Sequence, residues 1–313
     1  MTVHRWQFIA KSWTGWPAIH AGLAALLAFA SATAAKADCF SASRPTLPID
    51  ERISSTLTNG EDGLAIVQTV STGAVDDLEV LVRTNPALLS TRTELPDGVR
   101  PSNGNMADLL TIAAANCDAG MVGALLELGA DPNGAIRGLA LTYAALADEL
   151  VMAAMLLQAG ADPDATTEGR TTALREVLYF ERPDAVEVLA AFGADVNRAD
   201  LVGGTPLDAA LTFGDWASAK VLMDAGANPW QVSNKGMLPA FRLLNASVQR
   251  RRDRDLRDEL LVRVQDGAPI WPPPPPMDVI RNVRIGAWPT DAMQRAGFVV
   301  TDSALRSINM VRP

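Results

Sequence analysis

A nine-residue phrase recurs in this chain at nearly constant spacing. It occurs as LLELGADPN, LLQAGADPD, LAAFGADVN and LMDAGANPW, with its glycine at Gly129, Gly160, Gly193 and Gly226. The steps between these glycines are 31, 33 and 33 residues. A fixed period of this size predicts a stacked array, in which each unit buries its apolar side only against its neighbours. We call this phrase the cap phrase.

Each cap phrase predicts the end of a helix. Its leucine-rich run has helical spacing, and the glycine that follows can enter the left-handed backbone region without a steric penalty. Three of the four copies then place a proline, at Pro132, Pro163 and Pro229, which cannot continue a helix and favours a turn.

A second recurrence follows each cap phrase and predicts the start of another helix. Its leucines keep one register through the chain, at Leu110, Leu141, Leu174, Leu207 and Leu238. In the clearest copy, Thr205 can cap a helix that begins at Pro206, because a missing N–H costs nothing at the first helical position. Each unit is therefore expected to contain two antiparallel helices and one protruding turn, which we call a finger turn.

Together the two recurrences resemble the ankyrin repeat family. The matching positions are Thr205, Pro206, Leu207, Ala210, Gly214, Gly226, Ala227 and Asn228. The resemblance covers residues 61–268 and implies an all-α fold, an ankyrin-type α-solenoid of about six helix-turn-helix repeats. A helical-hairpin array of another family is the alternative.

The chain departs from the family at the start of the first helix of each repeat. The histidine that is usual there is replaced by Thr111, Thr142, Arg175, Asp208 and Pro239. The family's usual hydrogen bonds between repeats are therefore not assumed for this chain.

The first 37 residues predict a signal peptide. Arg5 and Lys11 precede an apolar run from Ala21 to Ala30, and residues 35–37 offer alanines at the two positions that a signal peptidase recognises. We expect cleavage after Ala37 and a location in the periplasm or outside the cell. The apolar run is too short to span a bilayer, so no stable membrane insertion is expected after cleavage. Retention as an N-terminal anchor is the alternative.

Removal of this segment would change the chemistry available to the chain. The segment contains Arg5, Lys11 and Lys36 but no acid, so its loss takes the net charge from −9 to −12. It also contains both histidines, His4 and His20. A chain without histidine has no histidine-based triad and lacks the usual zinc and iron ligand sets. We therefore expect no catalytic residue, no metal site and no cofactor.

Cys39 and Cys117 are the only two cysteines. An even pair in an oxidising compartment favours a disulfide, which would constrain the unfolded chain by about 4 kcal/mol. Cys117 falls in the loop between two helices, where the family often has glycine, so its thiol is expected to be reachable. A small buried thiol at Cys117 is the alternative.

The beginning of the array is expected to be irregular. Residues 38–60 are polar and rich in turn formers, which predicts an extended lead-in. The first repeat is degenerate, with Gly73 at the turn between its helices and Asn85 at the position of the cap glycine. Residues 91–105 contain too many turn formers for a helix and predict an inserted loop between the first two repeats.

The end of the array is expected at residue 268, because Gly267 and Ala268 repeat the cap phrase once more. Residues 269–276 contain five consecutive prolines and predict a polyproline strap packed on the last repeat. Polyproline also binds aromatic grooves in partner domains, which is the alternative. Residues 277–313 are expected to cover the exposed apolar face of the last repeat as a C-terminal cap.

The resemblance also implies a binding surface, because the finger turns of this family line up beside a concave helical face that binds macromolecules. On this chain the candidate contact residues are Ile136, Arg137, Glu168, Arg170, Asp200, Leu201, Val202, Asn234 and Lys235. The acidic balance favours a basic partner protein. The cluster Arg250–Arg252 is nearly cancelled by the acids that follow it, so no nucleic-acid binding is expected.

We therefore expect a non-catalytic module that binds a partner protein, and an inhibitor or a protective partner is a more specific version. An enzyme that works with carboxylates alone is the alternative from another class, since Asp131, Asp162 and Asp195 recur in line. The recurrence itself favours turn formation, because a catalytic pair has to be singular. A passive envelope scaffold is a third alternative.

Overall fold

The computed structural model describes most of the chain after residue 57. The described residues are 58–94, 106–147, 150–167, 171–201 and 203–310. The expected signal peptide, most of the lead-in and Cys39 lie outside them, so the cleavage site and the disulfide stay predictions. Within them, no helix combines the length and the apolar character needed to cross a membrane.

The described chain is mostly helical, with fifteen α-helices, as the sequence predicts. Twelve of them form consecutive pairs, each joined by a short loop. The pairs are α2 (Gly60–Thr72) with α3 (Val75–Thr84), α4 (Leu109–Ala115) with α5 (Ala119–Glu127), α6 (Leu139–Leu146) with α7 (Val151–Gln158), α8 (Ala173–Tyr179) with α9 (Pro183–Ala191), α10 (Pro206–Phe213) with α11 (Trp216–Asp224), and α12 (Pro239–Asn245) with α13 (Arg251–Asp266).

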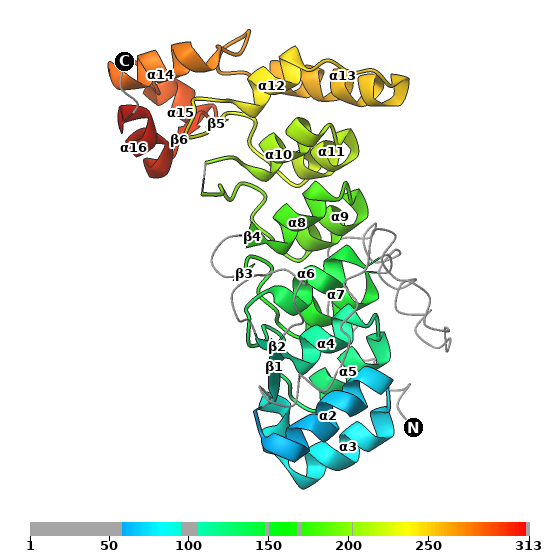
Figure 1. Cartoon of the computed structure of the whole chain (residues 1–313). Helices are drawn as coiled ribbons and strands as arrows, with labels where there is room; N and C mark the ends of the chain where they lie inside the picture. Colours follow the sequence, from blue (N-terminus) through cyan, green and yellow to red (C-terminus); the bar gives the residue numbers. More distant parts are fainter. Residues whose placement is uncertain (1–57, 95–105, 148–149, 168–170, 202, 311–313) are drawn as a thin grey trace.

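The pairs lie one upon another in chain order (Figure 1). The first helices pack in the series α2, α4, α6, α8, α10 and α12, each against the next. The second helices α9, α11 and α13 do the same. One continuous apolar core runs through all the pairs and includes the register leucines, which are at most 2% exposed.

The helix ends follow the local signals in the sequence. The cap-phrase glycines have φ values of 95°, 98°, 90° and 91°, which confirms the predicted left-handed ends. Gly267 is the C-cap of α13, at the predicted end of that helix, but with φ −96° it is not left-handed. Asn85 is the C-cap of α3, at the position that the sequence predicts for it. This residue is extended, with φ −142°, because Pro86 follows it and begins the 3-10 helix η3 (Pro86–Ser90).

The loops inside the pairs share one backbone feature. Gly73, Cys117, Glu181 and Gly214 each have a positive φ, between 54° and 77°. The predicted turn at Gly73 is confirmed, and Cys117 lies in the loop between α4 and α5 as expected. A left-handed residue therefore reverses the chain in four of the pairs, whether or not it is glycine.

The helix starts are capped by side chains. Thr205 Oγ1 accepts a hydrogen bond of 3.2 Å from the backbone N–H of Asp208, which confirms the predicted cap before Pro206. Asp108 and Thr172 do the same for α4 and α8. Because these bonds satisfy N–H groups that a helix leaves without partners, they fix where α4, α8 and α10 begin.

Two antiparallel pairs of short strands lie in the connections between helix pairs. β1 (Arg92–Glu94) and β2 (Met106–Asp108) are antiparallel and flank the part of the predicted 91–105 loop that lies outside the described residues. β3 (Thr166–Thr167) and β4 (Thr171–Thr172) are also antiparallel. The absence of a helix was predicted correctly for the described part of the loop, but the strand pairing was not foreseen.

The C-terminal residues form a unit of their own. It contains α14 (Pro276–Arg284), α15 (Asp291–Arg295), β6 (Val299–Val300) and α16 (Asp302–Met310). Strand β6 pairs in parallel with β5 (Gln231–Val232), which belongs to the last finger turn. Pro276, which was expected in the polyproline strap, instead begins α14, where a proline is well tolerated.

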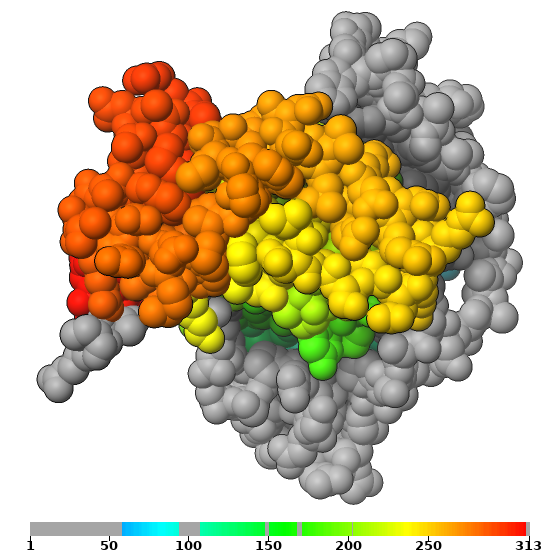
Figure 2. Space-filling view, turned by 90° about the horizontal axis from the view of Figure 1, so that it is seen from above, coloured from blue at the N-terminus to red at the C-terminus, as the bar shows by residue number. Residues whose placement is uncertain are grey.

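The C-terminal unit lies beside the last helix pair and not over it. Figure 2 shows its orange and red residues at one side, with the yellow residues of α12 and α13 still visible from above. One close approach is at Gly236 of the last finger turn, where an added Cβ would meet Ile280 and the carbonyl of Pro276. The expected cap over the final repeat is therefore corrected to a unit that packs on a finger turn.

Candidate functional site

The recurrent acids and amides of the cap phrases build the finger turns. Asp131, Asp162, Asp195 and Asn228 each accept a hydrogen bond of 2.8–3.0 Å from the backbone N–H two residues later. This is the local bond by which such side chains stabilise turns. Four side chains in equivalent positions therefore have the same structural role.

A second set of side chains ties each finger turn to the next. Asn133 Oδ1 accepts a hydrogen bond of 2.8 Å from the backbone N–H of Asp162. Asp164 does the same for Asp195 at 3.0 Å, and Asn197 does so for Asn228 at 2.6 Å. The sequence signal was the Asp or Asn that ends each of the first three cap phrases. These bonds hold neighbouring finger turns in register.

The first two finger turns contain four of the predicted contact residues. Ile136 is half-buried and packs against the core. Arg137 is exposed and forms an ion pair of 3.2 Å with Asp162. Both side chains of that pair are largely in solvent, so it contributes little to stability. Glu168 and Arg170 lie outside the described residues, as does Val202 of the next finger turn.

In the third finger turn, Asp200 faces α8 and Leu201 faces solvent. The carboxylate of Asp200 lies 2.5 Å from Arg175 of α8 and accepts a hydrogen bond of 2.8 Å from the N–H of Gly204. Gly203, with φ 76°, donates to the carbonyl of Asp200. Leu201 is 76% exposed. The structure therefore presents an apolar side chain on a turn that is held from two sides.

The last finger turn contacts the C-terminal unit of the same chain. Asn234 is half-buried, and the hydroxyl of Ser303 in α16 donates a hydrogen bond of 3.4 Å to its side-chain oxygen. Lys235 is exposed. Of the predicted contact residues that are described, Arg137, Leu201 and Lys235 are thus the ones that face solvent.

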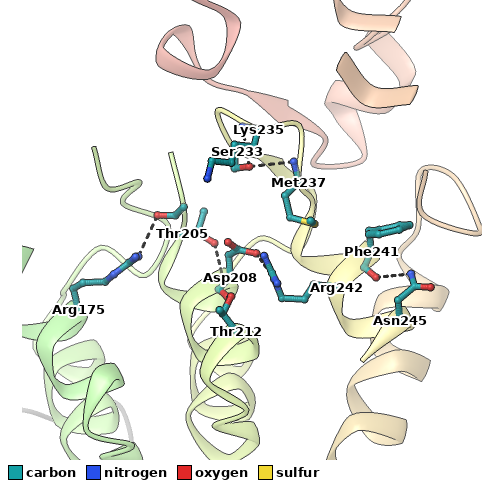
Figure 3. A network of polar contacts seen from close by, with 11 residues as sticks. Arg175, Thr205, Asp208, Thr212, Ser233, Lys235, Met237, Phe241, Arg242 and Asn245 are labelled. Atoms are coloured by element: carbon teal, nitrogen blue, oxygen red, sulfur yellow. Dashed lines mark hydrogen bonds and ion pairs between the residues drawn. The ribbon is translucent and has the colours of Figure 1, made fainter. Parts of the chain in front are cut away.

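Helices α8, α10 and α12 lie side by side and share a polar surface (Figure 3). We call this surface, which carries Arg175, Asp208 and Arg242, the inner face. Arg242 Nε donates a hydrogen bond of 2.8 Å to Asp208 Oδ1 and so links α12 to α10. Arg175 links α8 to the following finger turn through Asp200. The sequence had marked Arg175 and Asp208 as replacements of the family's histidine, but their ion pairs were not predicted.

Three exposed aromatic residues lie at the far end of the inner face. Tyr179 and Phe180 close α8, and Phe213 closes the neighbouring helix α10. Their exposed fractions are 66%, 45% and 40%. The ring of Tyr179 lies 5.3 Å from that of Phe180 and 5.6 Å from that of Phe213, with the rings nearly perpendicular in both pairs. We call these three residues the aromatic cluster.

The aromatic cluster belongs to the inner face because Tyr179 lies four residues after Arg175 on α8, and residues at this spacing share one side of a helix. Sequence reasoning missed it. Its only signal was an aromatic residue at the end of two neighbouring helices, in Leu178-Tyr179-Phe180 and Leu211-Thr212-Phe213.

The loop after the aromatic cluster is held by Arg182. Its guanidinium donates hydrogen bonds of 2.8 Å to the carbonyls of Leu146 and Ala147 at the end of α6, and one of 2.9 Å to Asp184. Partial burial acts to raise the pKa of Asp184, but the hydrogen bond and charge of Arg182 outweigh it and lower that pKa. The loop that follows the aromatic cluster is therefore held by hydrogen bonds from a charged donor.

Helices α4 and α6, which precede α8 in the same series, have no comparable surface. Every residue of α4, and residues 139–145 of α6, are buried. Tyr143 of α6 is 7% exposed, and burial raises its pKa to about 12. Between α4 and α12, the accessible inner face thus begins at α8.

Among the described residues, no three His, Cys, Asp or Glu side chains lie close enough together to hold a metal ion. A hollow of about 490 Å³ lies against α13 and is lined by Arg251, Arg252, Asp255, Leu256 and Glu259, all from that one helix. No protein-family model matches the chain, and no curated protein is significantly similar to it.

Proposed function

We propose that this chain is an ankyrin-type α-solenoid that is exported to the periplasm or the cell exterior and binds a partner protein without catalysis. Consecutive helix pairs at a fixed sequence period support the solenoid. So do the left-handed glycine at each cap phrase and the hydrogen bonds that tie each finger turn to the next. A restraining or protective role toward an exported protein is the more specific form of this proposal.

The observation that carries the proposal is the position of Leu201. Among the described residues between 58 and 270, it is the most exposed large apolar side chain. Asp200 and Gly204 fix the turn beneath it, so little backbone freedom is lost when a partner covers it. Burying a leucine contributes about 1.5–3 kcal/mol. An exposed apolar side chain beside a hydrogen-bonded turn is suited to a contact surface.

The roles of the recurrent acids support a module without catalysis. Asp131, Asp162 and Asp195 each hold a finger turn through a backbone N–H. Asp162 also pairs with Arg137. A general acid or base needs an oxygen within reach of a substrate, whereas these carboxylates serve one repeated structural purpose.

The proposal is tested by capture followed by titration. The exported chain, immobilised, is exposed to an envelope extract of its own source, and retained proteins are identified by mass spectrometry. The purified partner is then titrated against the wild-type chain and against Leu201→Asp. We expect Leu201→Asp to weaken binding by about tenfold or more, because the variant loses apolar burial and places a charge in the contact.

A matched control comes from α13, where Val262 is 58% exposed and lies outside the inner face. Val262→Asp introduces the same charge and should bind the partner as the wild type does. Equal binding by wild type and Leu201→Asp would move the contact away from the third finger turn. Retention of no protein by the wild-type chain would contradict the proposed function itself.

A further inference from the structure

We propose that the aromatic cluster of Tyr179, Phe180 and Phe213, with the acids beside it, binds an arginine side chain of a basic segment in the partner protein. The inference rests on the proposed function and names the chemistry of the partner at one end of the inner face.

The first step is the exposure of the rings. Tyr179 is 66% exposed although it touches both Phe180 and Phe213 edge to face. Two neighbouring helices supply the three rings, so the cluster forms only when the helix pairs are stacked. Clustered exposed aromatic side chains on a braced surface are typical of contact sites, since they bring a large contact area at a low cost in conformational entropy.

The second step is the charge around the rings. Glu176 lies three and four residues before Tyr179 and Phe180 on α8, which places it on the same side of that helix. Glu181 follows Phe180 directly and is exposed, with φ 54°. Within the described residues neither glutamate forms an ion pair.

The two nearest basic residues in the sequence do not offset these charges. Arg175, directly before Glu176, forms an ion pair with Asp200. The guanidinium of Arg182 is occupied by two carbonyls of the α6 end and by Asp184. Aromatic faces with unpaired carboxylates beside them attract a cation, through the ring quadrupole and through charge.

The third step is the choice of arginine. Its planar guanidinium stacks on an aromatic ring while its N–H groups donate to carboxylates. A purely apolar segment would remove Glu176 and Glu181 from water without giving them a partner. A second copy of the chain would place the same acidic rim against itself in a two-fold interface. A basic partner also agrees with the chain's net charge of −9.

The test uses a fluorescein-labelled peptide of alternating arginine and glycine and a second peptide in which citrulline replaces arginine. Citrulline keeps the shape of arginine and removes its charge. Fluorescence anisotropy measures the binding of each to the full chain. We expect the arginine peptide to bind more tightly, and Tyr179→Ala and Phe213→Ala each to weaken its binding about three- to fivefold.

Two controls separate the cluster from general attraction to an acidic protein. Val262→Ala removes an exposed apolar side chain elsewhere and should leave binding unchanged. Glu176→Gln should weaken binding about two- to fivefold, whereas Asp77→Asn, which removes one exposed charge on α3, should not. Thermal melting of each variant confirms that it folds. Unchanged binding by Tyr179→Ala and Phe213→Ala, or equal binding of the two peptides, would overturn the inference.

The same variants are titrated with the partner that the capture experiment identifies. If that protein is weakened by Leu201→Asp but not by Tyr179→Ala, the proposed function stands and this inference is wrong. If nothing is captured while the arginine peptide still requires the cluster, the docking chemistry is supported and the proposed function is not. Self-association that Tyr179→Ala abolishes would show that the occupant is a second copy and would also overturn the inference.

Discussion

The side-chain amide of Asn228 donates a hydrogen bond of 2.7 Å to the backbone carbonyl of Gly297, 69 residues further along the chain. One repeat earlier, Asn197 makes the same bond to Gly226, at 3.1 Å. Gly226 and Gly297 also share a left-handed backbone, with φ 91° and 92°. The end of α15 therefore takes the place that the next cap phrase would occupy. Helix α13 does not supply it, since Gly267 is not left-handed.

This relationship predicts that Asn228→Asp will loosen the C-terminal unit while preserving the finger turn. An aspartate still accepts the bond from the N–H of Trp230, as other cap-phrase aspartates do in their turns, but it cannot donate to Gly297. We expect a loss of about 2 kcal/mol in unfolding free energy and faster hydrogen exchange at Val299, whose N–H bonds to the carbonyl of Trp230.

The matched control is Asn245→Asp, because the Asn245 side chain is exposed and bonds only within α12. It should leave the exchange of Val299 unchanged. If Asn228→Asp also leaves that exchange at the wild-type rate, the C-terminal unit does not depend on this bond.

A comparison of two glycines measures how closely the last two finger turns approach. Gly214→Ala places a Cβ in open space, so its cost is that of the left-handed backbone alone, about 1–2 kcal/mol. Gly203 has the same φ of 76°, but its added Cβ would meet the backbone nitrogen of Asn234 at 2.6 Å. Chemical denaturation should show a larger loss for Gly203→Ala. Equal losses would mean that the two turns have room to separate.

The sequence predicts the helix pairs well because their signals are local. A left-handed glycine ends a helix and Thr205 starts one through atoms only a few residues apart, and both are confirmed. The predictions fail where an adjacent residue or a contact distant in sequence determines the local structure. Pro86 keeps Asn85 extended, and the bond from Asn228 to Gly297 recruits residues that no periodicity connects.

The candidate site also has a part that the sequence predicts and a part that it does not. Leu201 could be predicted as exposed, because it stands at the tip of a turn whose position the period fixes. The aromatic cluster could not, since Tyr179 and Phe213 meet only through the stacking of α8 on α10. The ion pairs of Arg175 and Arg242 also join different helix pairs. A single sequence contains these residues but not their contacts.

Arg182 is predicted to be the main support of the loop that follows α8. Its side chain is 16% exposed and satisfies the carbonyls of Leu146 and Ala147. Arg182→Ala should lower the unfolding free energy by about 3 kcal/mol, because hydrogen bonds from a charged donor are lost at a helix end. Arg182→Lys should recover only part, since an ammonium group does not reproduce the planar fork. Urea unfolding measures both, and full recovery by lysine would contradict the two-carbonyl role.

Tyr143 is predicted to make the fold sensitive to alkali. Burial raises its pKa from 10.0 to about 12. Below pH 10 the phenol is neutral in both the folded and the unfolded chain, so its ionisation takes nothing from the unfolding free energy. Between pH 10 and 12 it ionises only in the unfolded chain, which lowers the unfolding free energy by about 1.4 kcal/mol per pH unit.

Tyr179→Phe leaves Tyr143 as the one tyrosine of the chain, so the ultraviolet absorbance of tyrosinate reports on it alone. We expect half-ionisation at about pH 12 in the folded chain, and about pH 10 once urea unfolds it. In the same background, Tyr143→Phe should remove this part of the loss of stability between those pH values. Ionisation of folded Tyr143 near pH 10 would show that water reaches the phenol. Residues 139–145 of α6 would then not all be buried in solution.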